Sequence, residues 1–349
     1  MEKDTTFNGS ENTKYFTRKS GQLIYGKLDF LHAAFGIVPQ NLNNYESTAD
    51  SPAFDINDVG DRIFLINYFL RPEFYLKNGE KANGSRKAKR IHEETFLNMP
   101  MQAPIKSEQE KIAKTLNSLN NTIQLHERKY EELTIIKQAL LQKLFPKKDE
   151  IKPEVRYENF SDAWEQRKLG EVAKIVGGGT PSTKVKEYWD GDINWYSPVE
   201  IGNSIYASGS VKRITELGLE KSSAKILPKG TVLFTSRAGI GNTAILSKEA
   251  ATNQGFQSIV PKKKLLDSYF IFTETPFLKK YGEINGAGST FVEVSGKQMA
   301  KMPLRLPLLE EQKKIGVFFK QIDSLIALHQ CKLEKLKQLK KFLLQNMFI

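Results

Sequence analysis

The sequence predicts an α+β protein of two related halves, which are joined by two long antiparallel helices of the coiled-coil type. Three observations predict this fold: a long segment that occurs twice, an apolar stripe at helical spacing within each copy, and short strand-like runs elsewhere in the chain. We expect both globular halves to be strand-rich, the first to be only partial, and the repeat to have pseudo-twofold symmetry.

The repeated segment is the strongest of these signals. Residues 104–145 align without a gap onto residues 307–348, and about 16 of the 42 aligned positions are identical. Both copies begin with Pro, carry a Glu-Gln pair and end in Leu-Leu-Gln-x-x-Phe. A repeat with so long a period indicates two similar structural units rather than a single irregular fold.

Each copy carries apolar residues in alternating steps of four and three, which is the coiled-coil pattern. A His and a Lys interrupt this seam at the same two places in both copies. At ~1.5 Å per residue the seam is roughly 48 Å long. The expected seam contains Ile112, Leu116, Leu119, Ile123, His126 and Leu133 in the first copy, and Ile315, Phe319, Ile322, Ile326, His329 and Leu336 in the second.

The two helices could pair parallel or antiparallel, and we expect antiparallel pairing. The intervening stretch of about 160 residues forms a domain, so antiparallel helices put one globular half at each end. This arrangement places His126 near Leu333 and His329 near Tyr130. A polar residue in an apolar seam can specify the register of pairing, or it can simply be half-exposed polarity. Neither His has neighbours suited to metal binding or catalysis.

Composition limits the class of protein. The 349 residues allow two or three domains, and 40% hydrophobic with 26% charged residues is typical of a globular chain. No apolar run is long enough to span a bilayer and the first residues lack a signal core, so we expect a cytoplasmic protein without membrane contact. The single Cys331 excludes an intrachain disulfide. The expected domains are a partial first domain (1–103), a spacer helix with linker (104–150), a second domain (151–306) and a second spacer helix (307–349).

The chain is strongly basic. Its net charge is +12 and its isoelectric point is about 9.4, which favours an acidic partner and nucleic acid first. Much of this charge lies on the long helices, where Lys and Arg also serve to solvate an exposed face.

The two globular halves are unequal. Residues Gly21–Tyr25 match Gly230–Phe234, but nothing before Gly21 matches residues 164–229, which include a Gly-rich turn at 177–182. We therefore expect the first globular domain to be shortened at its N-terminal side by about 50 residues relative to the second.

Catalytic motifs are absent from the sequence. It contains no G-x-x-x-x-G-K-[ST], H-E-x-x-H or G-x-S-x-G, and four scattered His with one Cys do not supply a structural zinc site. The chain is therefore expected to be a binding protein rather than an enzyme, and to bind no cofactor or metal of its own.

Four motifs in a fixed order carry a family resemblance. They are W-E-Q-R-K-L-G-E-V at 164–172, G-G-G-T-P-S at 177–182, G-T-V-L-F-T-S-R-A-G-I-G at 230–241 and P-L-L-E-E-Q-K-K-I at 307–315. Together with the duplicated helix they resemble the specificity subunit of type I restriction-modification enzymes. The resemblance is strong over residues 150–349 and weaker over residues 1–149.

The resemblance implies a non-catalytic subunit with two target recognition domains. Each domain reads one half of a split double-stranded DNA sequence, and the helices set the distance between the halves. Two modification (methyltransferase) subunits dock on this scaffold to methylate adenine, and restriction subunits can then join. S-adenosylmethionine and ATP with Mg²⁺ are expected on those partners and not on this chain.

Residues expected to contact DNA are sorted by the chemistry of the contact. Surface cations suit phosphates, Arg and amide side chains suit base edges, and residues beside the Gly-rich turn suit either. The phosphate candidates are Lys184, Lys186, Lys212, Arg213 and Lys248; the base candidates are Arg237, Asn242 and Gln254; Thr180, Ser182 and Tyr196 flank the turn. In the first half, Asn83, Arg86 and Lys87 belong to a basic cluster that is either a DNA-facing loop or a solvated turn.

Apolar residues off the seam widen the stripe on both helices. They are Ile135, Ile136, Leu325 and Leu339. This is more apolar surface than one partner helix requires, and it is typical of a docking site for another subunit.

Two alternatives stay open. The chain could be a coiled-coil scaffold whose globular halves bind protein. If the shortened first half does not read DNA, two copies of the chain could instead form a homodimer that reads a symmetric site with two second halves.

Overall fold

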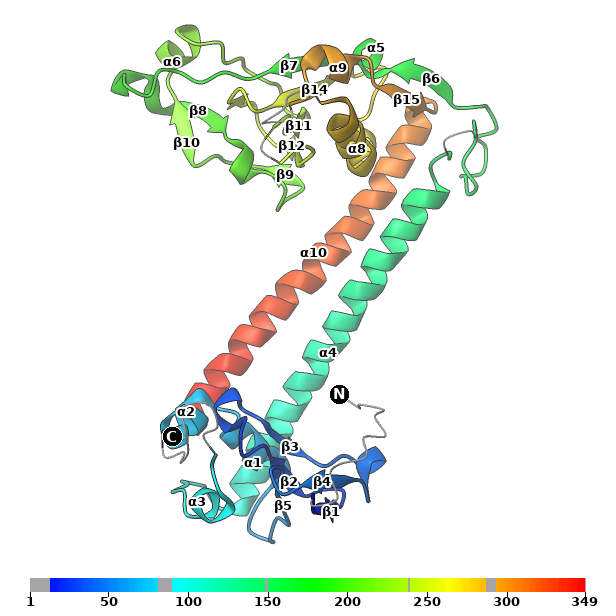
Figure 1. Ribbon diagram of the computed structural model, residues 1–349. Helices are drawn as coiled ribbons and strands as arrows, with labels where there is room; N and C mark the ends of the chain where they lie inside the picture. The colour runs from blue at the N-terminus through cyan, green and yellow to red at the C-terminus, as the bar shows by residue number, and fades with distance from the viewer. Residues whose placement is uncertain (1–12, 81–89, 148–149, 238, 287–292, 349) are drawn as a thin grey trace. The chain divides into compact units, whose positions relative to one another are not determined.

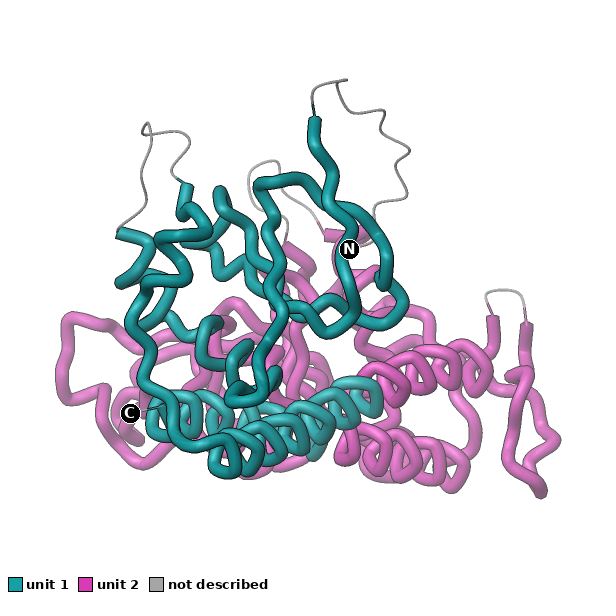
Figure 2. The backbone as a smooth tube through the Cα atoms, turned by 90° about the horizontal axis from the view of Figure 1, so that it is seen from below, with its two compact units in different colours: residues 1–130, 328–349 teal, residues 131–327 magenta. Residues whose placement is uncertain are grey.

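A computed structural model describes residues 13–80, 90–147, 150–237, 239–286 and 293–348. The chain divides into two compact units, which Figure 2 shows in different colours. Unit 1 consists of residues 1–130 and 328–349, and unit 2 consists of residues 131–327. The two longest helices, α4 (Lys106–Lys143) and α10 (Leu309–Asn346), each contribute residues to both units (Figure 1).

Unit 1 contains two small antiparallel sheets and three short helices before α4. One sheet pairs β1 with β4, and the other has the strand order β3-β2-β5. The elements are β1 (Tyr15–Thr17), β2 (Leu23–Tyr25), β3 (Phe35–Ile37), β4 (Glu46–Thr48), β5 (Ala53–Phe54), α1 (Arg62–Phe69), α2 (Pro72–Gly79) and α3 (Glu93–Leu97).

Unit 2 is richer in strands. Its sheets have the orders β7-β14-β11-β12-β9, β10-β8-β13 and β15-β6. The strands are β6 (Glu165–Lys168), β7 (Ala173–Gly177), β8 (Trp189–Tyr196), β9 (Tyr206–Ala207), β10 (Lys212–Ile214), β11 (Val232–Phe234), β12 (Thr243–Leu246), β13 (Ala251–Thr252), β14 (Gln257–Pro261) and β15 (Pro303–Leu306). The helices before α10 are α5 (Leu169–Val172), α6 (Glu216–Glu220), α7 (Ser268–Thr273), α8 (Thr275–Asn285) and α9 (Gly296–Ala300).

The two units share a three-stranded core. β2 lies between β3 and β5 in unit 1, as β11 lies between β12 and β14 in unit 2, and every one of these pairs is antiparallel. Gly21 and Gly230 precede the two central strands with φ angles of +88° and +87°, a region that favours glycine. Their N–H groups donate to the carbonyls of Val38 and Leu246 at 2.8 and 2.9 Å. The sequence match between these segments is thus a match in structure as well.

The long helices also begin in the same way in both units. Gln109 and Gln312 are repeat-equivalent, and both side chains are buried. Each accepts the N–H of an Asp that caps a short helix and donates to the carbonyl of the Pro before the long helix. The partners are Asp61 and Pro104 for Gln109 (3.0 and 2.9 Å), and Asp267 and Pro307 for Gln312 (3.0 and 3.0 Å).

The units differ in what surrounds this shared core. The strands β6 to β10 of unit 2 precede its central strand, and the part of unit 1 that the structure describes holds only β1 before its own. Among the described residues, unit 1 therefore has fewer strands before its central strand than unit 2 has, in line with the mismatch in sequence before Gly21.

In unit 1, residues 106–130 of α4 run beside residues 328–346 of α10. Leu119, Ile123 and Leu333 bury one another between the two helices. The Nδ1 atoms of His126 and His329 are 2.7 Å apart. We expected each His to face an apolar residue of the other helix, but the two imidazoles face each other, a register about one helical turn away.

In unit 2, residues 131–143 of α4 run beside residues 309–327 of α10. The Lys137 Nζ atom lies 2.5 Å from the Asp323 carboxylate, which also accepts the hydroxyl of Tyr269 at 2.8 Å. Burial, followed by the Asp323 charge, raises the pKa of Tyr269. This buried carboxylate explains the Lys in the first apolar seam. Its repeat-equivalent is Asn120, so the second copy lacks a matching acid for Lys340.

In both units the first part of one long helix pairs with the last part of the other, so the pairing is antiparallel. The seam residues that are buried are Ile112, Leu116, Leu119, Ile123, Ile315, Phe319 and Ile322; those that are half-buried are His126, Leu133, Ile326, His329 and Leu336. The expected α+β fold with two long antiparallel helices is confirmed. Of the helices in the described ranges, none combines the length and apolarity that crossing a membrane requires.

Candidate nucleic-acid interface

Three turns of unit 2 meet at one place, and we call them the loop cluster: residues 177–182, residues 236–242 and residues 252–257. Residue 238 lies outside the described residues. The Gly179 N–H donates to the Thr252 carbonyl, and the Ser236 N–H donates to the Gly255 carbonyl, both at 2.8 Å. Backbone hydrogen bonds therefore fix the turns to one another.

Glycine is required where the first turn crosses the third. A Cβ atom on Gly178 would lie 1.9 Å from the Asn253 carbonyl oxygen, and one on Gly179 would lie 2.3 Å from the Ala224 nitrogen. The Gly179 carbonyl accepts the indole N–H of Trp195 at 2.8 Å. The Gly-rich run is thus a packing device that brings Thr180 and its neighbours against the third turn. Trp195 is a core aromatic.

The loop cluster presents several of the expected base-reading side chains. Thr180, Asn242 and Gln254 are exposed, and the Thr180 hydroxyl donates to the side-chain carbonyl of Gln254. Asn242 lies over Gly202, whose added Cβ would be 3.1 Å from the Asn242 Cγ atom. The structure brings Thr180 and Gln254 into direct contact, although 74 residues separate them in sequence.

Arg237 lies along the third turn beside an acidic residue that sequence reasoning missed. A Cβ on Gly255 would be 3.6 Å from the Arg237 Nε atom. The Arg237 guanidinium is 3.9 Å from the Glu293 carboxylate, with the two side chains 37% and 40% exposed. Glu293 follows no motif and is distant in sequence, so only its position beside Arg237 marks it.

A second group of candidates surrounds the β10-β8-β13 sheet. The Lys212 ammonium lies over the ring of Trp189, 5.6 Å from its centroid, and the Trp189 indole donates to the Ser182 carbonyl at 3.1 Å. These contacts join the end of the Gly-rich turn to the sheet. The exposed residues of this group and of the neighbouring strands include Ser182, Lys184, Lys186, Lys212, Arg213 and Lys248.

Tyr196 does not belong to the exposed set. Its side chain is 3% exposed and packs in a hydrophobic cluster with Leu233 and Phe256. Burial, with a smaller effect of the Glu200 charge, raises the pKa of Tyr196. Its backbone carbonyl accepts the Asn253 N–H at 3.0 Å. Tyr196 therefore supports the third turn from below and presents no surface to a ligand.

The basic cluster of the first half cannot be placed in the same way. Asn83, Arg86 and Lys87 lie outside the described residues. Arg90, at the end of this cluster, contacts Asp50 at 3.2 Å.

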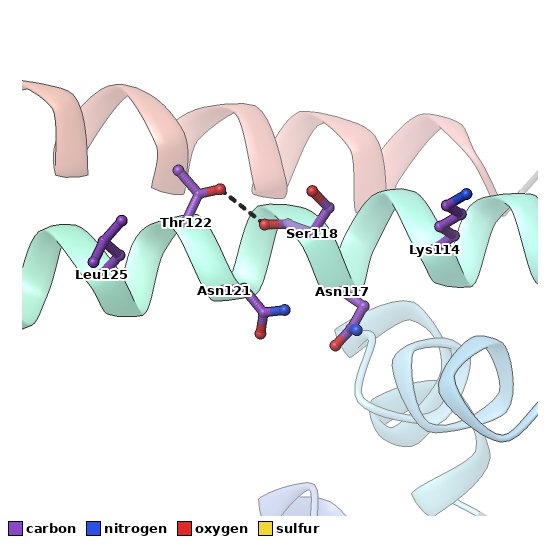
Figure 3. Close-up of a pocket in the computed structure, with 6 residues that line it drawn as sticks. All are labelled: Lys114, Asn117, Ser118, Asn121, Thr122 and Leu125. Carbon is purple, nitrogen blue, oxygen red and sulfur yellow. Dashed lines mark hydrogen bonds between the residues drawn. The ribbon is translucent and has the colours of Figure 1, made fainter.

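The long helices carry an open groove and an exposed apolar face. The groove, of about 350 Å³, is lined along one side of α4 in unit 1 by Lys114, Asn117, Ser118, Asn121, Thr122 and Leu125 (Figure 3). The Thr122 hydroxyl is satisfied within the helix by the Ser118 carbonyl at 2.9 Å. Small polar side chains with a single Lys suit contact with another protein better than they suit catalysis. Exposed apolar residues on the same two helices include Ile135, Ile136, Leu325, Leu339 and Phe342.

In the described ranges, no three His, Cys, Asp or Glu side chains are arranged to hold a metal ion. Cys331 is exposed on α10. What the loop cluster offers is hydrogen-bond donors and acceptors on a rigid platform, bordered by surface cations. Such a surface is suited to recognising the edges and backbone of nucleic acid.

The chain is similar in sequence to known specificity subunits. The chain is 38% identical over 189 residues to the MjaIX type I restriction enzyme specificity subunit of Methanocaldococcus jannaschii, a match that covers 53% of this chain and 44% of that subunit. It is 26% identical over 287 residues to the putative MjaX specificity subunit of the same organism, covering 80% of this chain and 64% of that subunit. The match to the EcoR124I/EcoR124II specificity subunit of Escherichia coli is 28% identical and covers 46% and 41% of the two chains. The matched part of the chain thus spans less than two thirds of each of these relatives.

Two solved structures share the fold. The type I restriction-modification S subunit from M. genitalium gives a TM-score of 0.59 at 15% identity, covering 96% of this chain and 84% of that one. A chain from a structure of type I complex assembly and conformational transition gives a TM-score of 0.54 at 17% identity, covering 98% of this chain and 84% of that one.

The family model of the type I restriction modification DNA specificity domain matches residues 53–134 and 161–338, more than half of the chain. The chain therefore belongs to the family of type I restriction modification DNA specificity domains.

Proposed function

We propose that this chain is the non-catalytic DNA specificity subunit of a type I restriction-modification system, and that unit 2 reads one half of a bipartite target. The observation that carries the proposal is the loop cluster, which holds exposed base-matching side chains on a backbone fixed by hydrogen bonds and glycine packing. The relatives in the family are specificity subunits of type I restriction enzymes, and this supports the assignment.

The residues of unit 2 divide by their chemistry. Side chains on the loop cluster can match base edges, because amides pair with adenine and Arg pairs with guanine. Cations on the surrounding strands and turns neutralise phosphates and position the domain. In this proposal Thr180, Ser182, Arg237, Asn242 and Gln254 approach bases, and Lys184, Lys186, Lys212, Arg213 and Lys248 approach phosphates.

Unit 1 is proposed to read the other half of the target with a smaller domain. It shares with unit 2 the three-stranded core and the hydrogen bonds that Gln109 and Gln312 make at the start of the long helices. It can therefore hold its loops in positions similar to those of unit 2. In its described part it has no counterpart of the Gly-rich turn, so its readers differ from those of unit 2. Asn83, Arg86 and Lys87 remain the candidates from sequence.

The long helices are proposed to carry the docking sites for two modification subunits. The exposed apolar residues of both helices support this, because solitary apolar side chains are common on surfaces but a continuing stripe favours a partner. Restriction subunits would join the assembled complex. S-adenosylmethionine and ATP with Mg²⁺ would bind to those partners, which carry the chemistry.

A homodimer that reads a symmetric site is the second candidate. The smaller first half favours it, since two copies of unit 2 would supply two equivalent readers. A palindromic recognition sequence would distinguish this version from the bipartite one.

DNA binding as a function of salt tests the proposal. The purified chain, with and without its modification subunit, is titrated with a mixed-sequence duplex between 50 and 300 mM salt, at about neutral pH. A reader that neutralises several phosphates gives a logarithm of affinity that falls linearly with the logarithm of salt concentration. A folded protein that binds its partner subunit but shows no salt-dependent DNA binding would favour the scaffold alternative.

A further inference from the structure

We infer that Arg237 reads a guanine in the half-site of unit 2 and that Glu293 is the residue that positions it. This inference rests on the proposed function and names one base and two residues within it. It joins a residue that the sequence pointed to with one that only the structure places there.

Backbone hydrogen bonds hold the two residues side by side. The Ser236 carbonyl accepts the N–H of Val294 at 3.0 Å, and the Ser236 N–H donates to Gly255 at 2.8 Å. Ser236 and Val294 are fully buried. Arg237 and Glu293 are the next residues in sequence. Their backbone positions are therefore fixed by the buried pair, while their side chains reach the surface.

Arg237 packs against Gly255, where a larger residue would not fit. A Cβ on Gly255 would lie 2.8 Å from the Pro198 ring and 3.0 Å from the Asn253 carboxamide oxygen. That oxygen also accepts the Gly255 N–H at 2.7 Å. The Arg237 side chain thus lies along a closely packed, hydrogen-bonded turn.

The guanidinium keeps its donors available. Arg156, elsewhere in unit 2, is a structural Arg: it holds Glu311 by two 2.8 Å hydrogen bonds, and the two side chains are 13% and 1% exposed. Arg237 is more exposed than Arg156 and makes no such hydrogen bonds to a described carboxylate. Its only contact with a charged group in the described ranges is the 3.9 Å approach to Glu293, and no hydrogen bond shorter than 3.5 Å joins it to a described residue. A guanidinium has five N–H donors, and the approach of Glu293 does not use them all. The Arg237 guanidinium can therefore donate to a further acceptor.

The neighbouring carboxylate selects a base over a phosphate. A phosphate approaching Arg237 would meet the negative charge of Glu293, which opposes it, while a base edge is neutral. Guanine offers O6 and N7, two acceptors spaced for the two parallel N–H groups of a guanidinium. Arg213, by contrast, is exposed on β10 and has no carboxylate within 4.0 Å among the described residues, so it suits a phosphate.

The test is selection of duplexes from a randomised pool by the full chain in complex with its modification subunit. The variants are Arg237→Gln, Arg237→Lys and Glu293→Gln, and Glu293→Asp serves as the conservative replacement. The matched control is Arg167→Gln, since Arg167 also pairs with an acid, Glu165 at 2.8 Å, but lies on β6 away from the loop cluster in sequence and fold. Thermal unfolding of each variant establishes that it folds.

We expect the wild-type half-site to contain a guanine that Arg237→Gln no longer selects. Discrimination at that one position falls by roughly 5- to 150-fold, the range for one bidentate base contact. Arg237→Lys loses most of it as well, since an ammonium cannot form the paired contact. Glu293→Gln loses part of it at the same position and Glu293→Asp restores it. The salt dependence of binding stays as in the wild type, and Arg167→Gln selects the wild-type sequence.

Three results would overturn the inference. Arg237→Gln could keep the full recognition sequence while its salt slope falls by about 1, which is the behaviour of a phosphate contact. Glu293→Gln could weaken every position alike together with stability, which would make it a structural residue. A folded wild-type complex that selects no sequence at all would contradict the proposed function itself, and the inference with it.

Discussion

At the scale of single residues, the His126–His329 contact ties the stability of the helix seam to pH. The two Nδ1 atoms are 2.7 Å apart, so a hydrogen bond between them requires one Nδ1 to donate and the other to accept. Burial lowers the pKa of His126, and the neighbouring His329 and Lys332 lower it further. A proton on His126 would place a positive charge within the helix seam, near the ammonium of Lys332.

We predict that protonation of His126 destabilises the chain at acid pH. The folded pKa of His126 lies below its unfolded value of about 6.5. As the pH falls, the unfolded chain therefore takes up the proton before the folded chain does. The contribution of His126 to the free energy of unfolding is present above its unfolded pKa and is lost as the pH falls below it. Urea unfolding measured between pH 7.5 and pH 5 tests this, and His126→Leu should have a flatter pH dependence than the wild type.

His32→Leu, at an exposed His outside the helix seam, is the matched control for the change of residue type. Burial raises the pKa of Glu274 in unit 2 to about 7, and this gives a slope of opposite sign. That slope is common to all variants, so the informative quantity is the difference between His126→Leu and His32→Leu. Equal slopes in the two variants would contradict the assignment.

A second residue-scale prediction concerns the buried ion pair of unit 2. Arg156→Ala leaves the Glu311 carboxylate, 1% exposed, without its two hydrogen bonds. Removing one member of a buried pair costs about 3–5 kcal/mol in the free energy of unfolding. The exposed pair of Arg167 and Glu165 is the matched comparison, and Arg167→Ala should change stability far less, because solvent screens an exposed pair. Chemical denaturation of both variants measures the difference, and similar losses would refute this reading of Arg156.

At the scale of elements, the Gly-rich turn supports the loop cluster by close packing. We predict that Gly178→Ala destabilises unit 2 by more than about 1 kcal/mol, because the new Cβ would lie 1.9 Å from the Asn253 carbonyl and must push the two turns apart. Gly209→Ala is the control, since a Cβ there meets nothing within 4 Å. Thermal unfolding compares the two. A loss no larger in Gly178→Ala than in Gly209→Ala would show that the turns do not need this contact.

The elements were predictable where the signal is periodic or repeated. The 3–4 spacing predicted the long helices. The matching hydrogen bonds of Gln109 and Gln312 are a finding of the structure, at a Glu-Gln pair that the sequence shows in both copies. The match of Gly21 to Gly230 predicted a shared strand. Each of these depends on local geometry, which neighbouring residues specify.

Contacts between distant segments were not predictable from the sequence. The sequence shows Lys137 only as an interruption of the apolar seam, and the structure pairs it with Asp323, 186 residues away. Tyr196 was expected at the surface beside the Gly-rich turn, but β8 turns its side chain into the core. Glu293 has no motif, and its place beside Arg237 follows from one backbone hydrogen bond between residues 236 and 294. Which side chains share a surface is set by tertiary packing, and a single sequence gives no direct measure of that.

At the scale of the whole molecule, the exposed apolar stripe should report on partner binding. We predict that Leu339→Glu combined with Phe342→Glu weakens binding of the modification subunit roughly tenfold or more, since both side chains are exposed on α10 and apolar anchors dominate interfaces. The control combines Gln338→Glu with Lys341→Glu on the same helix. Isothermal titration with the modification subunit measures the affinities. Equal affinities for the two double variants would place the docking site elsewhere.

The central claim is that this chain gives its complex a DNA sequence to recognise. The most direct test is a genome-wide map of adenine methylation in cells that express the modification subunit with and without the chain. We predict a new bipartite motif that depends on the chain, with one half lost when the loop cluster is disrupted by Gly178→Ala. A palindromic motif would instead indicate a homodimer that reads a symmetric site. The same methylation pattern with and without the chain, despite a complex that co-purifies, would contradict the claim.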